Sequence, residues 1–192
     1  MLRVLSFFFL LFPAFLSAKN NFFIAEVDSS AKEFIRKLFY AGVEDEKKAQ
    51  ELYNLLTGKY KAEVKAQDPF IYGYLGASET LLAKHHANPF KKVDYLTDGL
   101  EKLAFAIGKK PRSLELRFVR YSIIHYLPFF FNYSTERDAD VEMIYTLLLQ
   151  KDYSELDRSV QKGIVEFVIE TDRLSKDKNE NLRRLLVNLA KI

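Results

Sequence analysis

The chain has 192 residues, of which 48% are hydrophobic and 29% charged, and its formal net charge is +3. This hydrophobic content excludes an intrinsically disordered chain, and the small net charge favours neither nucleic acid nor an anionic membrane as a partner. The sequence has no cysteine, which excludes disulfides and lipid-modified cysteines, so the fold depends on burial of side chains.

The first 18 residues have the pattern of an export signal. Arg3 supplies a positive charge, residues 4–12 form an apolar core, and the small residue Ala18 ends the segment. The apolar core is shorter than the roughly 20 residues that a membrane-spanning helix needs. We therefore expect cleavage after Ala18, with an uncleaved amino-terminal anchor as the alternative.

The rest of the chain divides into a short arm and one domain. Residues 19–27 form the predicted arm, and residues 28–192 contain no linker or low-complexity stretch that would divide them. The sequence therefore predicts an exported protein, periplasmic or secreted, with a single all-α domain at residues 28–192.

Helix boundary signals recur through the first half of this domain. Ser30 and Glu33 form a capping box for a first helix, and Gly58 can adopt the left-handed conformation that closes a second. Asp68 and Asn88, each followed by proline, predict the starts of a third and a fourth helix. Residues 59–67 fit either a loop or an extension of the third helix.

Four further helices are predicted in the second half. Each has apolar residues at the 3.6-residue period, and Ser154 and Asp157 provide the entry to the seventh. The apolar stripes lie at residues 113–127, 141–148, 160–168 and 182–189. About eight amphipathic helices with short connections predict an all-α fold of stacked antiparallel hairpins, either a short α-solenoid or an irregular helical bundle.

Aromatic, leucine and small residues in the third and fourth helices, followed by a proline, form a recognisable pattern. The pattern comprises Tyr72, Leu75, Gly76, Gly99, Leu103, Ala106 and Pro111. Over residues 69–111 it resembles a tetratricopeptide repeat, in which small residues let two helices approach closely. The glycines are further apart than in that family, so both helices are expected to be longer. The resemblance implies a protein-interaction scaffold.

The run from Leu114 to Tyr121, together with the phenylalanine-rich signal segment, resembles uncharacterised exported helical proteins of Bacteroidetes-type bacteria. Those proteins carry no catalytic motif that could be transferred to this chain. The resemblance implies a bacterial cell-envelope protein.

Two charged residues lie on apolar helix faces. Glu79 shares a face with Leu75 and Leu82, and Arg120 lies among the apolar positions of the next helix but one. Buried charges persist when they are paired, so we expect Glu79 and Arg120 to form a buried ion pair. A binding pocket that uses Glu79 as an acid or base is the alternative.

The sequence predicts no metal and no cofactor. His85 and His86 are adjacent, which points their rings in different directions on a helix, and His125 is the only other histidine. A metal site needs side chains that converge on one point, as two histidines four residues apart on a helix do. No catalytic triad, nucleotide-binding loop or paired-carboxylate motif is present either.

An aromatic segment follows Pro128. It consists of Phe129, Phe130, Phe131 and Tyr133. We expect it to plug one end of the core; the alternative is an exposed apolar surface that binds a partner or an acyl ligand.

These observations favour a non-enzymatic interaction or scaffold module whose partner is another envelope protein. Nucleic acid is not expected, and membrane contact is expected only if the signal segment is retained. A carrier with a cavity lined by Tyr121 and the three phenylalanines is one alternative. A hydrolase of envelope polymers that uses Glu79 and His125 is another.

Overall fold

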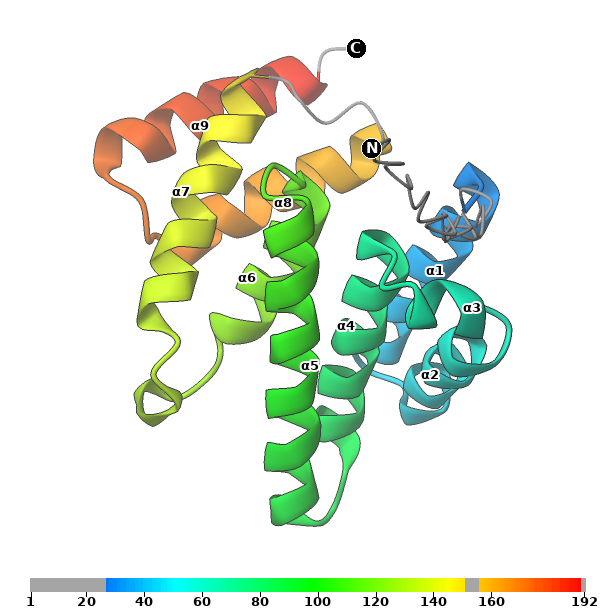
Figure 1. Cartoon of the computed structure of the whole chain (residues 1–192). Helices are drawn as coiled ribbons and strands as arrows, with labels where there is room; N and C mark the ends of the chain where they lie inside the picture. Colours follow the sequence, from blue (N-terminus) through cyan, green and yellow to red (C-terminus); the bar gives the residue numbers. More distant parts are fainter. Residues whose placement is uncertain (1–26, 151–155, 191–192) are drawn as a thin grey trace, which may run out of the picture.

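The computed structural model describes residues 27–150 and 156–190, and these contain nine α-helices, one 3-10 helix and no strand (Figure 1). The predicted all-α class is confirmed. The predicted signal peptide and residues 19–26 of the arm lie outside the described residues. The helices are α1 (Ser29–Gly42), α2 (Glu46–Gly58), α3 (Lys61–Lys65), α4 (Pro69–His85), α5 (Pro89–Lys109), α6 (Leu114–Ile124), η1 (Phe129–Phe131), α7 (Ser134–Gln150), α8 (Arg158–Thr171) and α9 (Lys176–Ala190).

Side-chain caps fix several helix starts. Asp68 and Asn88 each accept hydrogen bonds from two backbone amides of the following turn, at the predicted starts of α4 and α5. The cap of α1 is Asp28 instead of the predicted Ser30, because Asp28 accepts hydrogen bonds from the Ala31 amide and from the Ser30 hydroxyl. Asp157 precedes α8 as expected, whereas Ser154 lies outside the described residues.

Some boundaries differ from the prediction. The undecided stretch 59–67 holds the separate short helix α3, and α2 ends at Gly58 without a left-handed glycine. Among the described residues, positive φ values occur instead at Gln67, Asn132 and Asp172. Because helix α6 ends at Ile124 instead of continuing to residue 127, the aromatic segment is free to form its own turn.

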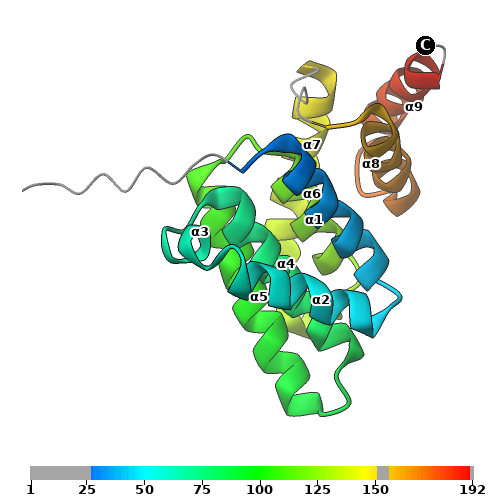
Figure 2. The same ribbon diagram turned by 90° about the vertical axis from the view of Figure 1, so that its right-hand side faces the viewer.

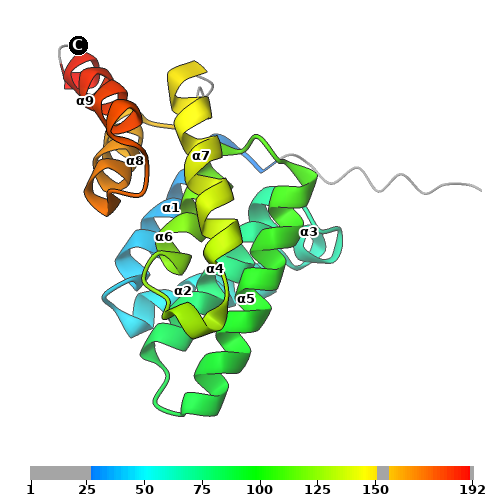
Figure 3. The ribbon, with the colours of Figure 1, turned by 90° about the vertical axis from the view of Figure 1, so that its left-hand side faces the viewer.

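Consecutive helices pack in pairs: α1 with α2, α4 with α5, α6 with α7 and α8 with α9. The α4–α5 hairpin lies in the middle of the molecule in Figure 1, with α1 to α3 on one side and α6 to α9 on the other. Figures 2 and 3 show the α8–α9 pair at the opposite end of the molecule from α3.

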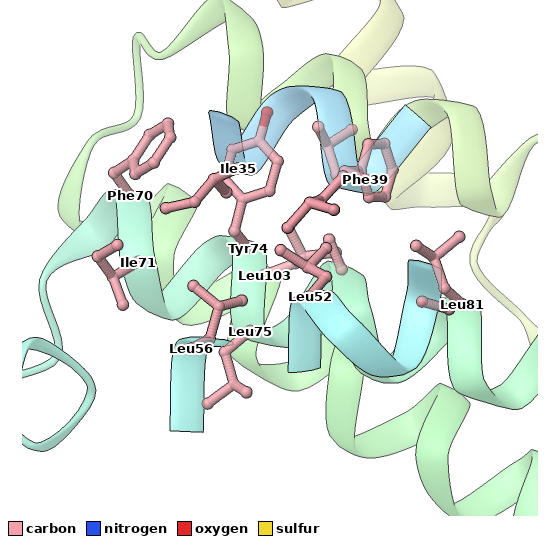
Figure 4. Close-up of a cluster of buried hydrophobic side chains, with 14 of the residues drawn as sticks. Ile35, Phe39, Leu52, Leu56, Phe70, Ile71, Tyr74, Leu75, Leu81 and Leu103 are labelled. Carbon is pink, nitrogen blue, oxygen red and sulfur yellow. The ribbon is translucent and has the colours of Figure 1, made fainter. Parts of the chain in front are cut away.

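Two main hydrophobic clusters hold these pairs together. The first is formed by α1, α2, α4 and α5 and includes the fully buried Ile35, Leu52 and Leu103 (Figure 4). The second is formed by α7, α8, α9 and the segments beside them. Helix α6 contributes to both, with Val119 in the first cluster and Phe118 in the second. Burial of each such large side chain stabilises the fold by about 1.5–3 kcal/mol.

Gly76 and Gly99 mark the closest approach of α4 and α5. A Cβ atom at Gly76 would lie 2.4 Å from the carbonyl oxygen of Gly99 and 2.9 Å from the Lys102 Cβ. Neither position has room for a side chain. The two backbones therefore touch, which brings the side chains on both sides of the crossing into close contact.

Candidate functional site

Glu79 forms an ion pair across the α4–α5 contact. Its carboxylate lies 2.7 Å from the ammonium group of Lys102 on α5, and both side chains are largely buried. Burial raises the pKa of Glu79 above its ordinary value of 4.5, and the Lys102 ammonium opposes that rise. The pair links the two central helices of the fold.

Arg120 pairs with a different acid. Its guanidinium donates two hydrogen bonds to Asp140 on α7, at 2.6 and 2.8 Å, and Arg117 donates a third at 2.8 Å. Asp140 is completely buried. The expected Glu79–Arg120 pair is thus replaced by two separate ion pairs, because each residue meets the helix that follows its own in the chain.

A third buried network joins α1, α4 and α6. Arg36 donates two hydrogen bonds to Glu115, at 2.6 and 2.9 Å, and the Tyr74 hydroxyl donates another at 2.6 Å. Burial and the adjacent Glu115 carboxylate raise the pKa of Tyr74 well above its usual range. Sequence reasoning missed this network, although Arg36 carries the same signal as Arg120, since it lies beside Ile35 and one turn before Phe39 on the buried side of its helix.

The histidines have separate surroundings. The His85 ring hydrogen-bonds the Gly42 carbonyl at 2.8 Å, and the His86 ring accepts from the Asn88 amide at 3.0 Å. His125 instead packs against aromatic rings at the end of α6. In residues 27–150 and 156–190, no cluster of histidine and acidic side chains could hold a metal ion.

The residues of the two alternative functions do not come together. Glu79 lies at the α4–α5 contact, whereas His125 contacts Phe167 on α8, with ring centroids 5.9 Å apart. Tyr121 is fully buried and its hydroxyl hydrogen-bonds Thr171 at 2.6 Å, whereas Phe129 is exposed. A hydrolytic pair of Glu79 with His125 and a cavity shared by Tyr121 and Phe129 both disagree with this arrangement.

The aromatic segment after α6 projects into solvent. The exposed fractions are 94% for Phe129, 69% for Phe130 and 74% for Tyr126. We refer to these three residues as the aromatic surface. The expected plug is wrong for Phe129 and Phe130. Phe131 is half-buried with its ring 4.8 Å from that of Phe130, and Tyr133 packs on the first cluster.

Local backbone geometry produces this projection. Pro128 has an extended conformation that ends the preceding turn, η1 follows, and Asn132 has φ 59° and ψ 34°. Asparagine tolerates this left-handed conformation better than most residues. The chain therefore reverses within one short turn, which leaves too little length to bring all of its rings back to the core.

Comparison of the chain with models of known protein families, with characterised proteins and with solved structures gives no match. The fold and the surfaces described above define an all-α protein of paired helices with exposed aromatic residues. Its function is inferred from the residues of this chain alone.

A helix that crosses a bilayer must be both long and apolar. Of the helices in residues 27–150 and 156–190, none combines the length and the apolar character that a membrane span requires.

Proposed function

We propose that this protein is an exported, non-enzymatic interaction module of the bacterial cell envelope that binds another envelope protein. The aromatic surface of Tyr126, Phe129 and Phe130 is its contact surface. The paired helices act as a scaffold that holds this surface away from the body of the molecule.

The exposure of the aromatic surface is the observation that carries the proposal. Contiguous apolar patches on a protein surface mark interaction sites, and aromatic residues are enriched at the centres of protein interfaces. Phe129 and Phe130 pack against each other with ring centroids 6.1 Å apart. Their joint burial against a partner would remove both rings from water.

The charges near this surface favour a protein partner. Residues 128–135 contain no charged side chain, and the nearby Arg137 pairs with Asp138 at 3.1 Å. Over residues 128–135 this surface is apolar and neutral, which fits an apolar patch on another protein. Arg173 and Arg137 lie near its Tyr126 edge, where both act on the adjacent His125.

The tetratricopeptide resemblance adds support. The close contact of Gly76 with Gly99 is the kind of helix approach that the small residues of that family allow. Helices α4 and α5 have 17 and 21 residues, which agrees with the longer helices that the wide glycine spacing requires. Proteins of that family commonly act as scaffolds, so the likeness points to binding.

The buried charges also support binding over catalysis. Glu79 and Arg120 have partners that connect neighbouring helices, so both serve the packing of the fold. Removal of either charge is expected to lower stability without a specific effect on a ligand.

Affinity capture from the envelope fraction of the native host tests the proposal. The wild-type chain should retain a recurring envelope protein, and the double substitution Phe129→Ser and Phe130→Ser should abolish that retention. Val187→Ser is the matched control, because Val187 is 52% exposed on α9, away from the aromatic surface.

The control variant should retain the same protein as the wild type, and circular dichroism should show an unchanged fold for both variants. Equal retention by the wild type and the double variant would refute the assignment of the surface. Absence of any recurring protein in the wild-type sample would refute the interaction module itself.

A further inference from the structure

A second apolar projection lies at the turn between α4 and α5. Phe90 is 80% exposed there, and the neighbouring Val93 is also exposed. The turn forms the lower tip of the molecule in Figures 1, 2 and 3, beyond the helices around it. The Phe90 backbone amide donates a hydrogen bond to the Asn88 side chain at 2.9 Å, which caps α5. Phe90 takes part in this bond through its backbone amide alone, so the cap does not require an aromatic side chain at position 90.

Cationic side chains surround this tip. Lys84, Lys91 and Lys92 are all exposed, and Asp94 is the only acidic residue in the stretch from 84 to 97. Lys84 pairs with Glu44 at 2.9 Å, and the Lys92 ammonium donates a hydrogen bond to the Lys84 carbonyl at 3.2 Å. Neither Lys91 nor Lys92 forms an ion pair with an acid among the described residues. We call Phe90, Lys91, Lys92 and Val93 the basic tip.

We infer that the basic tip contacts the surface of an anionic lipid bilayer. Phe90 and Val93 enter the boundary between headgroups and acyl chains, and the two lysines remain at the level of the lipid phosphates. Amphipathic segments bind membranes in this way, with apolar side chains buried a short distance and cations attracted by anionic headgroups.

The basic tip differs from the aromatic surface in its charge. The basic tip combines one phenylalanine and one valine with two exposed lysines, whereas residues 128–135 carry no charge. Lysine is depleted at the centres of protein interfaces but favoured beside anionic membranes. A convex turn with few apolar atoms also offers little area to a protein partner, while a fluid bilayer can close around it.

The inference goes beyond the proposed function and does not depend on it. It also changes the expectation that membrane contact requires a retained signal segment. The formal net charge of +3 is spread over the whole chain, and two of its cations, Lys91 and Lys92, lie at this projecting tip.

The absence of tryptophan from the sequence permits a direct test. A Phe90→Trp variant of the full chain has a single indole whose emission reports the surroundings of that position only. Lipid binding through another part of the chain leaves this signal unchanged. The probe is a vesicle of phosphatidylglycerol and phosphatidylcholine, compared with a vesicle of phosphatidylcholine alone.

The emission of Phe90→Trp should shift to shorter wavelength with the anionic vesicles, and brominated lipid should quench it. Addition of Lys91→Glu and Lys92→Glu should weaken the apparent vesicle affinity at least about 25-fold, since each lysine near an anionic surface contributes about fivefold and the two factors multiply. High salt should weaken it in the same direction. Val187→Trp, at an exposed apolar position on α9, should show no shift.

Three results would overturn the inference: no shift for Phe90→Trp, an equal shift with phosphatidylcholine alone, or an equal shift for Val187→Trp. The assay contains lipid and no other protein, so its outcome is separate from that of the affinity capture. Failure of the capture leaves the vesicle result standing, and failure of the vesicle assay leaves the protein partner standing.

Discussion

Asp140 is the residue on which the α6–α7 contact depends. It has no exposed surface, and its carboxylate accepts hydrogen bonds from both Arg117 and Arg120. Burial of a charge in the interior is tolerated here because two cations and three hydrogen bonds compensate the lost hydration. Loss of the carboxylate leaves two largely buried guanidinium groups without an anion.

Asp140→Ala should therefore lower the free energy of unfolding by about 3–5 kcal/mol, as measured by urea denaturation followed by circular dichroism. Asp138→Ala is a matched control two residues away, because the Asp138 side chain is 65% exposed and its ion pair with Arg137 faces solvent. The Asp138→Ala control should lower the free energy of unfolding by less than about 1 kcal/mol. Equal losses for the two variants would contradict the structural role of Asp140.

At the scale of elements, the contact of α4 with α5 depends on two glycines. Gly76 lies against the backbone of Gly99, whereas a Cβ atom added at Gly163, in the middle of α8, would have no neighbouring atom within 4 Å. Replacement of glycine by alanine therefore has opposite consequences in the two helices. In α4 an added methyl group forces the helices apart, and in α8 it enters open space.

Gly76→Ala should destabilise the protein by about 1–3 kcal/mol through this steric conflict. Gly163→Ala should stabilise it by up to about 1 kcal/mol, since alanine has the higher helix propensity. Thermal and urea denaturation of both variants check that the free energy of unfolding falls for Gly76→Ala and rises for Gly163→Ala. A stabilised Gly76→Ala variant would show that the two helices do not touch at this point.

At the scale of the whole molecule, α6 is the only described helix whose buried residues belong to both main clusters. Within the described residues, helices α8 and α9 contribute nothing to the first cluster, and α1 to α5 contribute nothing to the second. The two halves of the fold therefore share a single helix. Their amides can lose protection from hydrogen exchange to different extents when one half is destabilised.

Ile164→Ala, in α8, should lower the free energy of unfolding by about 2–5 kcal/mol. It should speed amide hydrogen exchange more in α8 and α9 than in α2 and α4. Ile35→Ala, in α1, should give the reverse pattern, because both residues are almost completely buried but in different clusters. Equal acceleration of all helices by either variant would indicate one cooperative unit in place of two.

Much of the fold could be predicted from the sequence because the relevant interactions are local. Apolar residues at the helical period, and caps such as Asp68 and Asn88, act within one or two turns of chain. The same reasoning recognised that Glu79 and Arg120 face the interior, since a residue's face follows from its neighbours on one helix.

Only the tertiary structure decided which residues meet. Lys102 and Asp140 became the partners of Glu79 and Arg120 because the helices cross at particular positions, and no local pattern fixes a crossing point. The exposure of Phe129 and Phe90 was also decided at this level. A side chain leaves water only where another element covers it, so the sequence determined the helices and their apolar faces, and packing determined which aromatic residues remained outside.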